Sequence, residues 1–132
     1  EKLDQKIFIS SAGTGNWHIG SLPDERMRQT AKSKGIILNS RAQQFQSEDF
    51  NRFNLVLAMD HSNLARLAEI APSNLPPDKL MLFRSFDPEN YGNLDVPDPY
   101  YGGAKGFDVV YQMVKRTSPK ILAHIKSQFL NL

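Results

Sequence analysis

The run Asp98-Pro99-Tyr100-Tyr101-Gly102-Gly103 holds the residue types best suited to chemistry in this sequence. It follows the last predicted strand, and in an open α/β sheet ligands bind beyond the carboxyl ends of the strands. Pro99 favours an extended backbone at Asp98, and two adjacent tyrosines offer flat apolar walls with polar tips. The competing interpretation is an exposed turn with ordinary Asp and Tyr side chains. The motif by itself favours this exposed turn over a functional site.

A second segment with small residues, Ser11 to His18, follows a short β-prone run. Its Gly13 and Gly15 do not fit the G-x-G-x-x-G pattern, and no P-loop lysine is present, so we exclude nucleotide binding here. Trp17 is the single tryptophan of the chain. It is interpreted either as a wall of a substrate site or as a partly buried anchor.

The remaining polar candidates favour structural roles. His18, His61 and His124 are far apart and lack the spacing of a metal site, so they are interpreted as structural or solvated. Asp60 ends an apolar run and is expected to cap the next helix rather than to act in catalysis. The chain contains no cysteine, which excludes a thiolate nucleophile, a disulfide and a zinc-thiolate site within these residues. No cofactor is expected.

Length and composition indicate an ordinary globular domain. The 132 residues fit a single domain spanning residues 1–132. An apolar fraction of 40% and a charged fraction of 23% exclude a disordered tail, a collagen and a coiled coil. A net charge of +2, spread along the chain, is too weak to indicate nucleic acid. No apolar run approaches the ~20 residues of a membrane span, so we expect a cytoplasmic protein without membrane partners.

Short apolar runs alternate with helical patterns along the chain, which predicts an α/β fold. The predicted strands are Lys6–Ser10, an edge strand Ile36–Leu38, Phe53–Met59 and Lys79–Phe83. Because helical patterns separate these runs, we expect parallel pairing with right-handed crossovers.

The helices have recognisable start and stop signals. One is expected between Ser21, a candidate cap, and Gly35, and a single turn is expected at 47–50 with Ser47 as its cap. Another follows Asp60 and ends at Pro72. The last runs from about Gly106 toward Leu130, and Pro119 should kink or restart it. Its predicted apolar stripe comprises Phe107, Val110, Val114, Ile121, Ile125 and Phe129.

Several blocks in order along the chain resemble the low-molecular-weight protein tyrosine phosphatases, in forms more typical of bacteria, including cyanobacteria, than of animals. They are Ser11-Ala12-Gly13-Thr14, Trp17-His18-Ile19-Gly20, Pro23-Asp24-Glu25-Arg26-Met27, Ser40-Arg41-Ala42-Gln43-Gln44, Glu48-Asp49-Phe50, Leu57-Ala58-Met59-Asp60 and Val96-Pro97-Asp98-Pro99-Tyr100-Tyr101-Gly102-Gly103. The resemblance covers essentially the whole chain, and its last block is the most specific. It implies a three-layer sandwich with a small parallel sheet flanked by helices.

The resemblance also implies a mechanism for a phosphotyrosine protein or aryl phosphate. A cysteine thiolate attacks phosphorus, and loop N–H groups with an arginine hold the phosphate oxygens. Asp98 matches the general acid that protonates the leaving phenolate. Trp17, Tyr100 and Tyr101 match the walls that grip the aromatic ring. Ser11 matches a serine that supports the nucleophile loop, and Ser40 stands where the family has a histidine in that network.

The chain departs from this family in one respect that affects both chemistry and fold. The family's first strand, Cys-x5-Arg loop and first helix do not align with any part of these 132 residues. We therefore expect the chain by itself to be inactive. We also expect an unpaired gap in the sheet, which the chain closes by repacking neighbouring strands or by borrowing a strand, giving a homo-oligomer.

Three functions remain open at this point. The first is a protein tyrosine phosphatase represented by part of its domain. The second is a pseudophosphatase or protein-interaction module that keeps the acid loop without a phosphate cradle. The third is an aberrant product without function, which would express poorly and aggregate through its exposed sheet edge.

Overall fold

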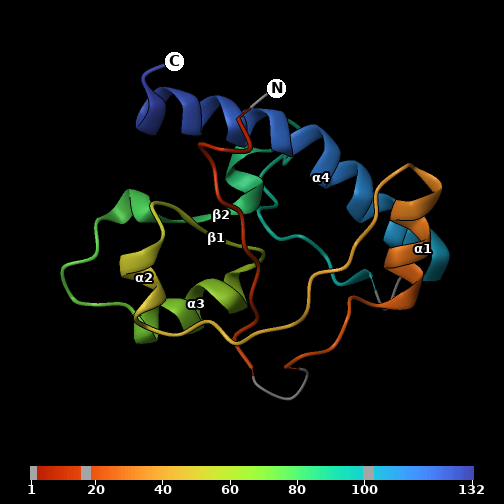
Figure 1. Cartoon of the computed structure of the whole chain (residues 1–132), viewed down its shortest axis with the longest axis horizontal. Coiled ribbons are helices and arrows are strands. Elements are labelled where there is room, and N and C mark those ends of the chain that lie inside the picture. The colour runs from red at the N-terminus through yellow and green to blue at the C-terminus, as the bar shows by residue number, and fades with distance from the viewer. Residues whose placement is uncertain (1–2, 16–18, 100–102) are drawn as a thin grey trace.

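A small parallel sheet forms the centre of the fold. The computed structural model describes residues 3–15, 19–99 and 103–132, with only the backbone of Ala104. Strands β1 (Val56–Ala58) and β2 (Leu80–Leu82) pair in parallel, with Val56 opposite Leu80. In Figure 1 they lie between α4 (Gly103–Ile125) on one side and α2 (Asp49–Arg52) and α3 (His61–Ile70) on the other. The predicted parallel pairing of a helix-flanked sheet is confirmed.

The core connects the sheet to α2 and α3. Its fully or nearly fully buried members are Phe50, Val56, Ala58, Leu67 and Leu82. β1 is shorter than the predicted run 53–59 because Phe53 belongs to the end of α2, where its N–H donates to the carbonyl oxygen of Asp49. Phe53 therefore closes a helical turn instead of extending the strand.

Helix α1 (Glu25–Ser33) begins and ends close to its predicted signals. Its cap is Asp24 rather than Ser21, because the Asp24 carboxylate accepts the Arg26 N–H at 2.8 Å. Gly35 has a φ of +84°, the left-handed conformation that favours glycine after a helix. The Ile36 N–H then donates to the carbonyl oxygen of Ala31 and closes the end of the helix.

The polar residues near α2 and α3 give one confirmation and one correction. Asp60 caps α3 as predicted, since its carboxylate accepts the Asn63 N–H at 2.7 Å. Ser47 does not cap α2, which starts after Glu48 without a side-chain cap. The Asp49 carboxylate accepts the Gln46 N–H at 2.9 Å instead, so the turn is held from inside the helix.

The last helix is continuous through Pro119 rather than restarting there, and a π-helical turn over Lys126–Leu130 follows it. Its buried stripe contains Phe107, Val110, Met113, Thr117 and Ile121. Val114 and Phe129, predicted on that stripe, are about two-fifths exposed. The stripe shifts toward Met113 and Thr117 because the helix packs against α1 and the 3₁₀ turn Phe83–Phe86 (η2). Within the described ranges, none of the helices is both long and apolar enough to cross a membrane.

Two predicted strands do not form. Residues 6–10 and 36–38 have no strand pairing in the structure, and the sheet among the described residues has only β1 and β2. A strand exists only through a hydrogen-bonded partner. The chain after residues 6–10 forms an isolated parallel bridge between Gly13 and Gln44, beyond the predicted strand. Phe8 and Ile9 consequently remain 77% and 84% exposed. The expected repacking of neighbouring strands is therefore not observed.

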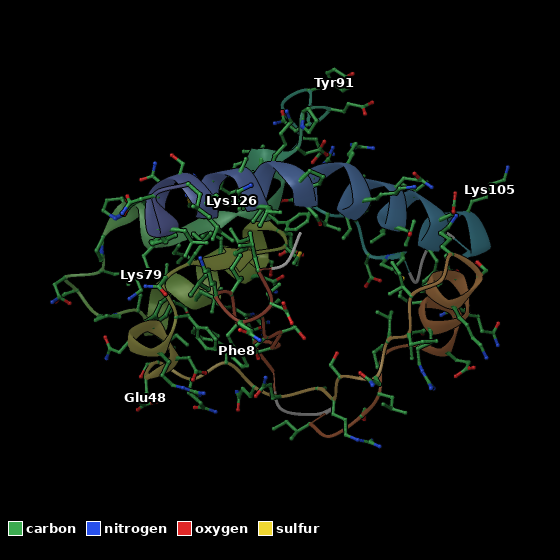
Figure 2. The ribbon with its side chains drawn as sticks, turned by 45° about the horizontal axis from the view of Figure 1, so that its top comes forward. Phe8, Glu48, Lys79, Tyr91, Lys105 and Lys126 are labelled. Carbon is green, nitrogen blue, oxygen red and sulfur yellow. The ribbon has the colours of Figure 1, made fainter. Side chains whose placement is uncertain are left out.

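A buried ion cluster joins α4 to the segment after β2. Asp87 is 2% exposed and accepts two hydrogen bonds from Arg116 of α4, at 2.8 and 2.9 Å, and one from Arg84 of η2 at 3.0 Å. Asp87 also accepts the Glu89 N–H at 2.8 Å. These bonds fix the base of a loop whose tip, Tyr91, projects beyond α4 (Figure 2) and is 87% exposed with a left-handed φ of 48°.

The Asp87 cluster makes stability depend on pH. The hydrogen bonds from Arg116 lower the pKa of Asp87 from 3.8 to about 2, against the opposing effect of burial. Ionised Asp87 therefore stabilises the folded chain fully above pH ~4, and this contribution is lost as the pH falls toward 2. The loss amounts to about 2 kcal/mol. We expect the decline measured by urea denaturation to be smaller by this amount in Asp87→Asn than in the unmodified chain.

Asp87→Asn should also lower the free energy of unfolding at pH 7 by about 3 kcal/mol or more, because two guanidinium groups lose their anionic partner. Asp78→Asn is the matched control, since Asp78 is exposed. An identical pH profile for the unmodified chain and Asp87→Asn would contradict the role of the cluster.

Thr117 offers a second test of the packing of α4. It is fully buried, and its hydroxyl is the buried side-chain polar atom without a hydrogen-bond partner among the described residues. Thr117→Val replaces the hydroxyl by a methyl group of similar size. We expect it to raise the free energy of unfolding by about 1 kcal/mol in thermal or urea denaturation. Thr117→Ser, which keeps the hydroxyl and loses the methyl group, should lower the free energy of unfolding. A Thr117→Val variant that is less stable than the unmodified chain would show that the hydroxyl has a hydrogen-bond partner.

Candidate active site

After β2 the chain returns to the carboxyl end of β1, at one edge of the sheet. Met59 follows β1 directly, and its carbonyl oxygen accepts the Val96 N–H at 2.8 Å. Because the two strands are parallel, their carboxyl ends lie at the same edge. The segment that begins at Val96 therefore starts at the edge where α/β sheets bind their ligands.

Asp95 fixes the start of this segment. Its Oδ1 accepts the His61 N–H at 2.9 Å and also contacts His61 Nδ1. Its carbonyl oxygen accepts a hydrogen bond of 2.8 Å from Arg84 Nη1. The hydrogen bond from the backbone of His61, followed by that from its ring, lowers the pKa of Asp95. The carboxylate is thus favoured in the form that accepts these bonds.

The predicted acid Asp98 lies three residues further on and is exposed. Pro97 and Pro99 flank it, so the backbone on both sides has little torsional freedom. Pro99 lies against the first part of α4, where a Cβ added to Gly106 would come within 2.7 Å of the Pro99 carbonyl oxygen. The glycine allows this close approach between helix and loop.

Ser11 and Ser40, the predicted supporting residues, line one cavity of about 510 Å³. Its other lining residues are Ile9, Ser10, Arg41, Ala42 and Gln43. The Gln43 amide donates to the Ser10 hydroxyl at 2.9 Å and to the Ser11 carbonyl oxygen at 2.8 Å, which ties the two segments together. The structure therefore brings Ser11 and Ser40 to one place, and Asp98 does not line that cavity.

The predicted aromatic walls fall on Trp17, Tyr100 and Tyr101, which lie outside the described residues. Their role in binding an aromatic ring stays a prediction. His18 also lies outside the described part of the chain.

Sequence reasoning missed the residues that anchor the acid-bearing segment. The sequence favours a structural or solvated role for His61 and gives no signal for a role of Asp95 or Arg84. The pairs lie 34 and 11 residues apart, so no local spacing connects them. The one available signal was that His61 directly follows Asp60, a capping residue at the carboxyl end of a strand.

The chemical groups of this region are limited. Across residues 3–15, 19–99 and 103–132, no three His, Asp or Glu side chains gather in a way that could hold a metal ion. Arg84 and Arg116 already bind the Asp87 carboxylate. The chain contains no cysteine, and the exposed groups near this sheet edge that could exchange a proton include the carboxyl of Asp98 and the ring of His61.

Comparison with known proteins identifies the relatives of this chain. Residues 1–130 match the family described as low molecular weight phosphotyrosine protein phosphatase. A low molecular weight protein-tyrosine-phosphatase of Streptomyces coelicolor is 43% identical over 96% of this chain and 77% of the relative. The corresponding phosphatase of Gallus gallus is 39% identical over 88% of this chain and 73% of the relative.

Solved structures give the same result. The crystal structure of a protein tyrosine phosphatase from Entamoeba histolytica superposes with a TM-score of 0.86 at 33% identity, covering 98% of this chain and 81% of that chain. The described residues, with their small parallel sheet and helices, thus have a fold like that of the low-molecular-weight phosphatases. The match of sequence and of structure over nearly the whole chain establishes that the protein belongs to the low-molecular-weight phosphotyrosine protein phosphatase family.

Proposed function

We propose that these 132 residues form the acid-loop and substrate-recognition part of a phosphotyrosine phosphatase, in which Asp98 is the general acid. The observation that carries this proposal is the exposed Asp98 in a segment anchored at the carboxyl edge of the sheet, in a chain of this family. Trp17, Tyr100 and Tyr101 would hold the aromatic ring of phosphotyrosine. Phenol has a pKa of about 10, so its oxygen leaves far better when it is protonated.

The nucleophile has to come from outside these residues. In the reaction that the family resemblance implies, a cysteine sulfur forms a bond to phosphorus as the bond from phosphorus to the phenolic oxygen breaks. Asp98 transfers its proton to that oxygen. The chain contains no cysteine, so it cannot form the phosphocysteine and should not hydrolyse phosphotyrosine without a supplied Cys-x5-Arg unit.

The test compares the 132-residue chain with the same chain extended at Glu1 by a strand, Cys-x5-Arg loop and helix of the family. We expect the extended protein, and not the unextended one, to hydrolyse phenyl phosphate and p-nitrophenyl phosphate. Asp98→Asn should then lower kcat/KM for phenyl phosphate by roughly 100-fold or more. The loss should be smaller for p-nitrophenyl phosphate, because its phenolate leaves more easily without a proton.

Asp78→Asn is the matched control and should change neither rate. Equal losses for the two substrates in Asp98→Asn would contradict the acid role. Hydrolysis by the unextended, mass-verified chain would contradict the need for an external thiolate.

The lack of cysteine also favours a second candidate function, a pseudophosphatase or interaction module. Titration of the unextended chain with phosphotyrosine, phosphoserine and unmodified peptides separates the two. Selective phosphotyrosine binding together with an inactive extended protein would favour this second function.

We also propose that the unpaired segment 6–10 recruits a strand from a second copy of the chain. Phe8 and Ile9 are mostly exposed there, and Ile37 is 68% exposed. Sedimentation should therefore show dimers or larger species at tens of micromolar, and Ile9→Lys should shift them to monomer, because a charge on a strand edge opposes pairing. Val109→Lys, at another exposed apolar side chain, should have no effect. A monomer at all concentrations would overturn this proposal.

A further inference from the structure

The general acid sits on a short segment with little internal freedom, Val96–Pro99, which we call the acid strap. Prolines occupy its second and fourth positions. Each proline fixes its own φ and also restricts the residue before it to extended conformations. Val96 and Asp98 are those preceding residues, so every residue of the strap is restricted. The two ends of so stiff a segment therefore determine where the backbone of Asp98 lies.

The first end is held from three elements. The Val96 N–H donates to the Met59 carbonyl oxygen after β1, and the Asp95 carboxylate receives two contacts from His61 at the start of α3. Arg84 of η2 donates to the Asp95 carbonyl oxygen. Arg84 is 4% exposed and is itself held by Asp87. This end is therefore fixed to the sheet and to the buried ion cluster.

The other end is held by close packing. The backbone of Pro99 lies against Gly106 of α4, with its carbonyl oxygen, Cα and carbonyl carbon 2.7, 3.4 and 3.5 Å from the place of a Cβ. Alanine normally stabilises a helix relative to glycine. Here its methyl group would have to displace backbone, so the strap, the helix or both would shift.

We propose that Asp95 and Gly106 are positioning residues that hold Asp98 at the sheet edge by fixing the two ends of the acid strap. This inference rests on the proposed role of Asp98 as general acid. Neither residue donates the proton; each determines where the donor stands. Loss of either end lets the carboxyl group leave the position from which it reaches the phenolic oxygen, and a displacement of about 1 Å is enough to cost a large factor in rate.

The first experiment needs no activity and uses the 132-residue chain. ¹⁵N relaxation reports the order parameter of the Asp98 N–H, which we expect near 0.85 in the unmodified chain. Asp95→Ala and Gly106→Ala should each lower it below about 0.6, whereas the value at Ala58 in β1 stays unchanged. Asp95→Asn, which keeps an oxygen acceptor for the His61 N–H, should restore most of the order.

The matched control for the helix variant is Gly13→Ala, because an added Cβ there meets nothing within 4 Å. It should leave the Asp98 value unchanged. A low order parameter in the unmodified chain, or unchanged values in both Asp95→Ala and Gly106→Ala, overturns the proposal.

The second experiment uses the extended protein described above. Asp95→Ala and Gly106→Ala should lower kcat for phenyl phosphate at least about tenfold, with a smaller effect on p-nitrophenyl phosphate and with KM nearly unchanged. Equal losses for both substrates would mean that the residues serve stability alone and would overturn the proposal. An extended protein that is inactive refutes the proposed function instead, and the relaxation data then decide whether the strap is held at both ends.

Discussion

The contact on which the rest of the structure depends is the buried Asp87 carboxylate between two guanidinium groups. Arg116 brings in the long C-terminal helix, and Arg84 brings in the turn that ends β2. Among the described residues the sheet has only two short strands. Side-chain contacts such as this ion cluster, rather than backbone pairing, therefore hold α4 against the sheet. The charges of Arg84, Arg116, Asp87 and Glu89 balance, and burial of Asp87 is acceptable because hydrogen bonds occupy both of its oxygens.

This chain belongs to a phosphatase family but contains no cysteine. Nearly the whole chain aligns with the low molecular weight phosphotyrosine protein phosphatases, and the segment that carries Asp98 is anchored at the sheet. The sulfur on which the family's reaction depends is absent. An acid assists a leaving group only as something attacks phosphorus, so the proposed acid role of Asp98 depends on a thiolate that these residues do not contain.

The sequence predicted the elements that depend on local signals. The parallel pair β1 and β2, the cap at Asp60 and the stop at Gly35 follow from apolar periodicity, capping chemistry and glycine conformation. It did not predict contacts between distant residues, such as Asp87 with Arg116 or Asp95 with His61. The predicted strand at 6–10 is wrong for a related reason, because a strand needs a hydrogen-bonded partner that a propensity pattern does not reveal.

The Tyr91 loop has a firmly held base and an exposed tip, and this affects where the chain can accept substitutions and insertions. Its base is tied down by Asp87 and by the bonds from Arg84 to the backbone of Glu89 and Asp95, whereas its tip stands away from the body of the protein. The Asn90 amide donates to the carbonyl oxygens of Arg84 and Asp87, and Asn93 accepts the Asp95 N–H. Tolerance to exchange or lengthening is therefore expected at the exposed Tyr91 tip rather than throughout the loop. An insertion at Tyr91, such as an epitope or a docking peptide, would then lie outside the acid strap that carries Asp98.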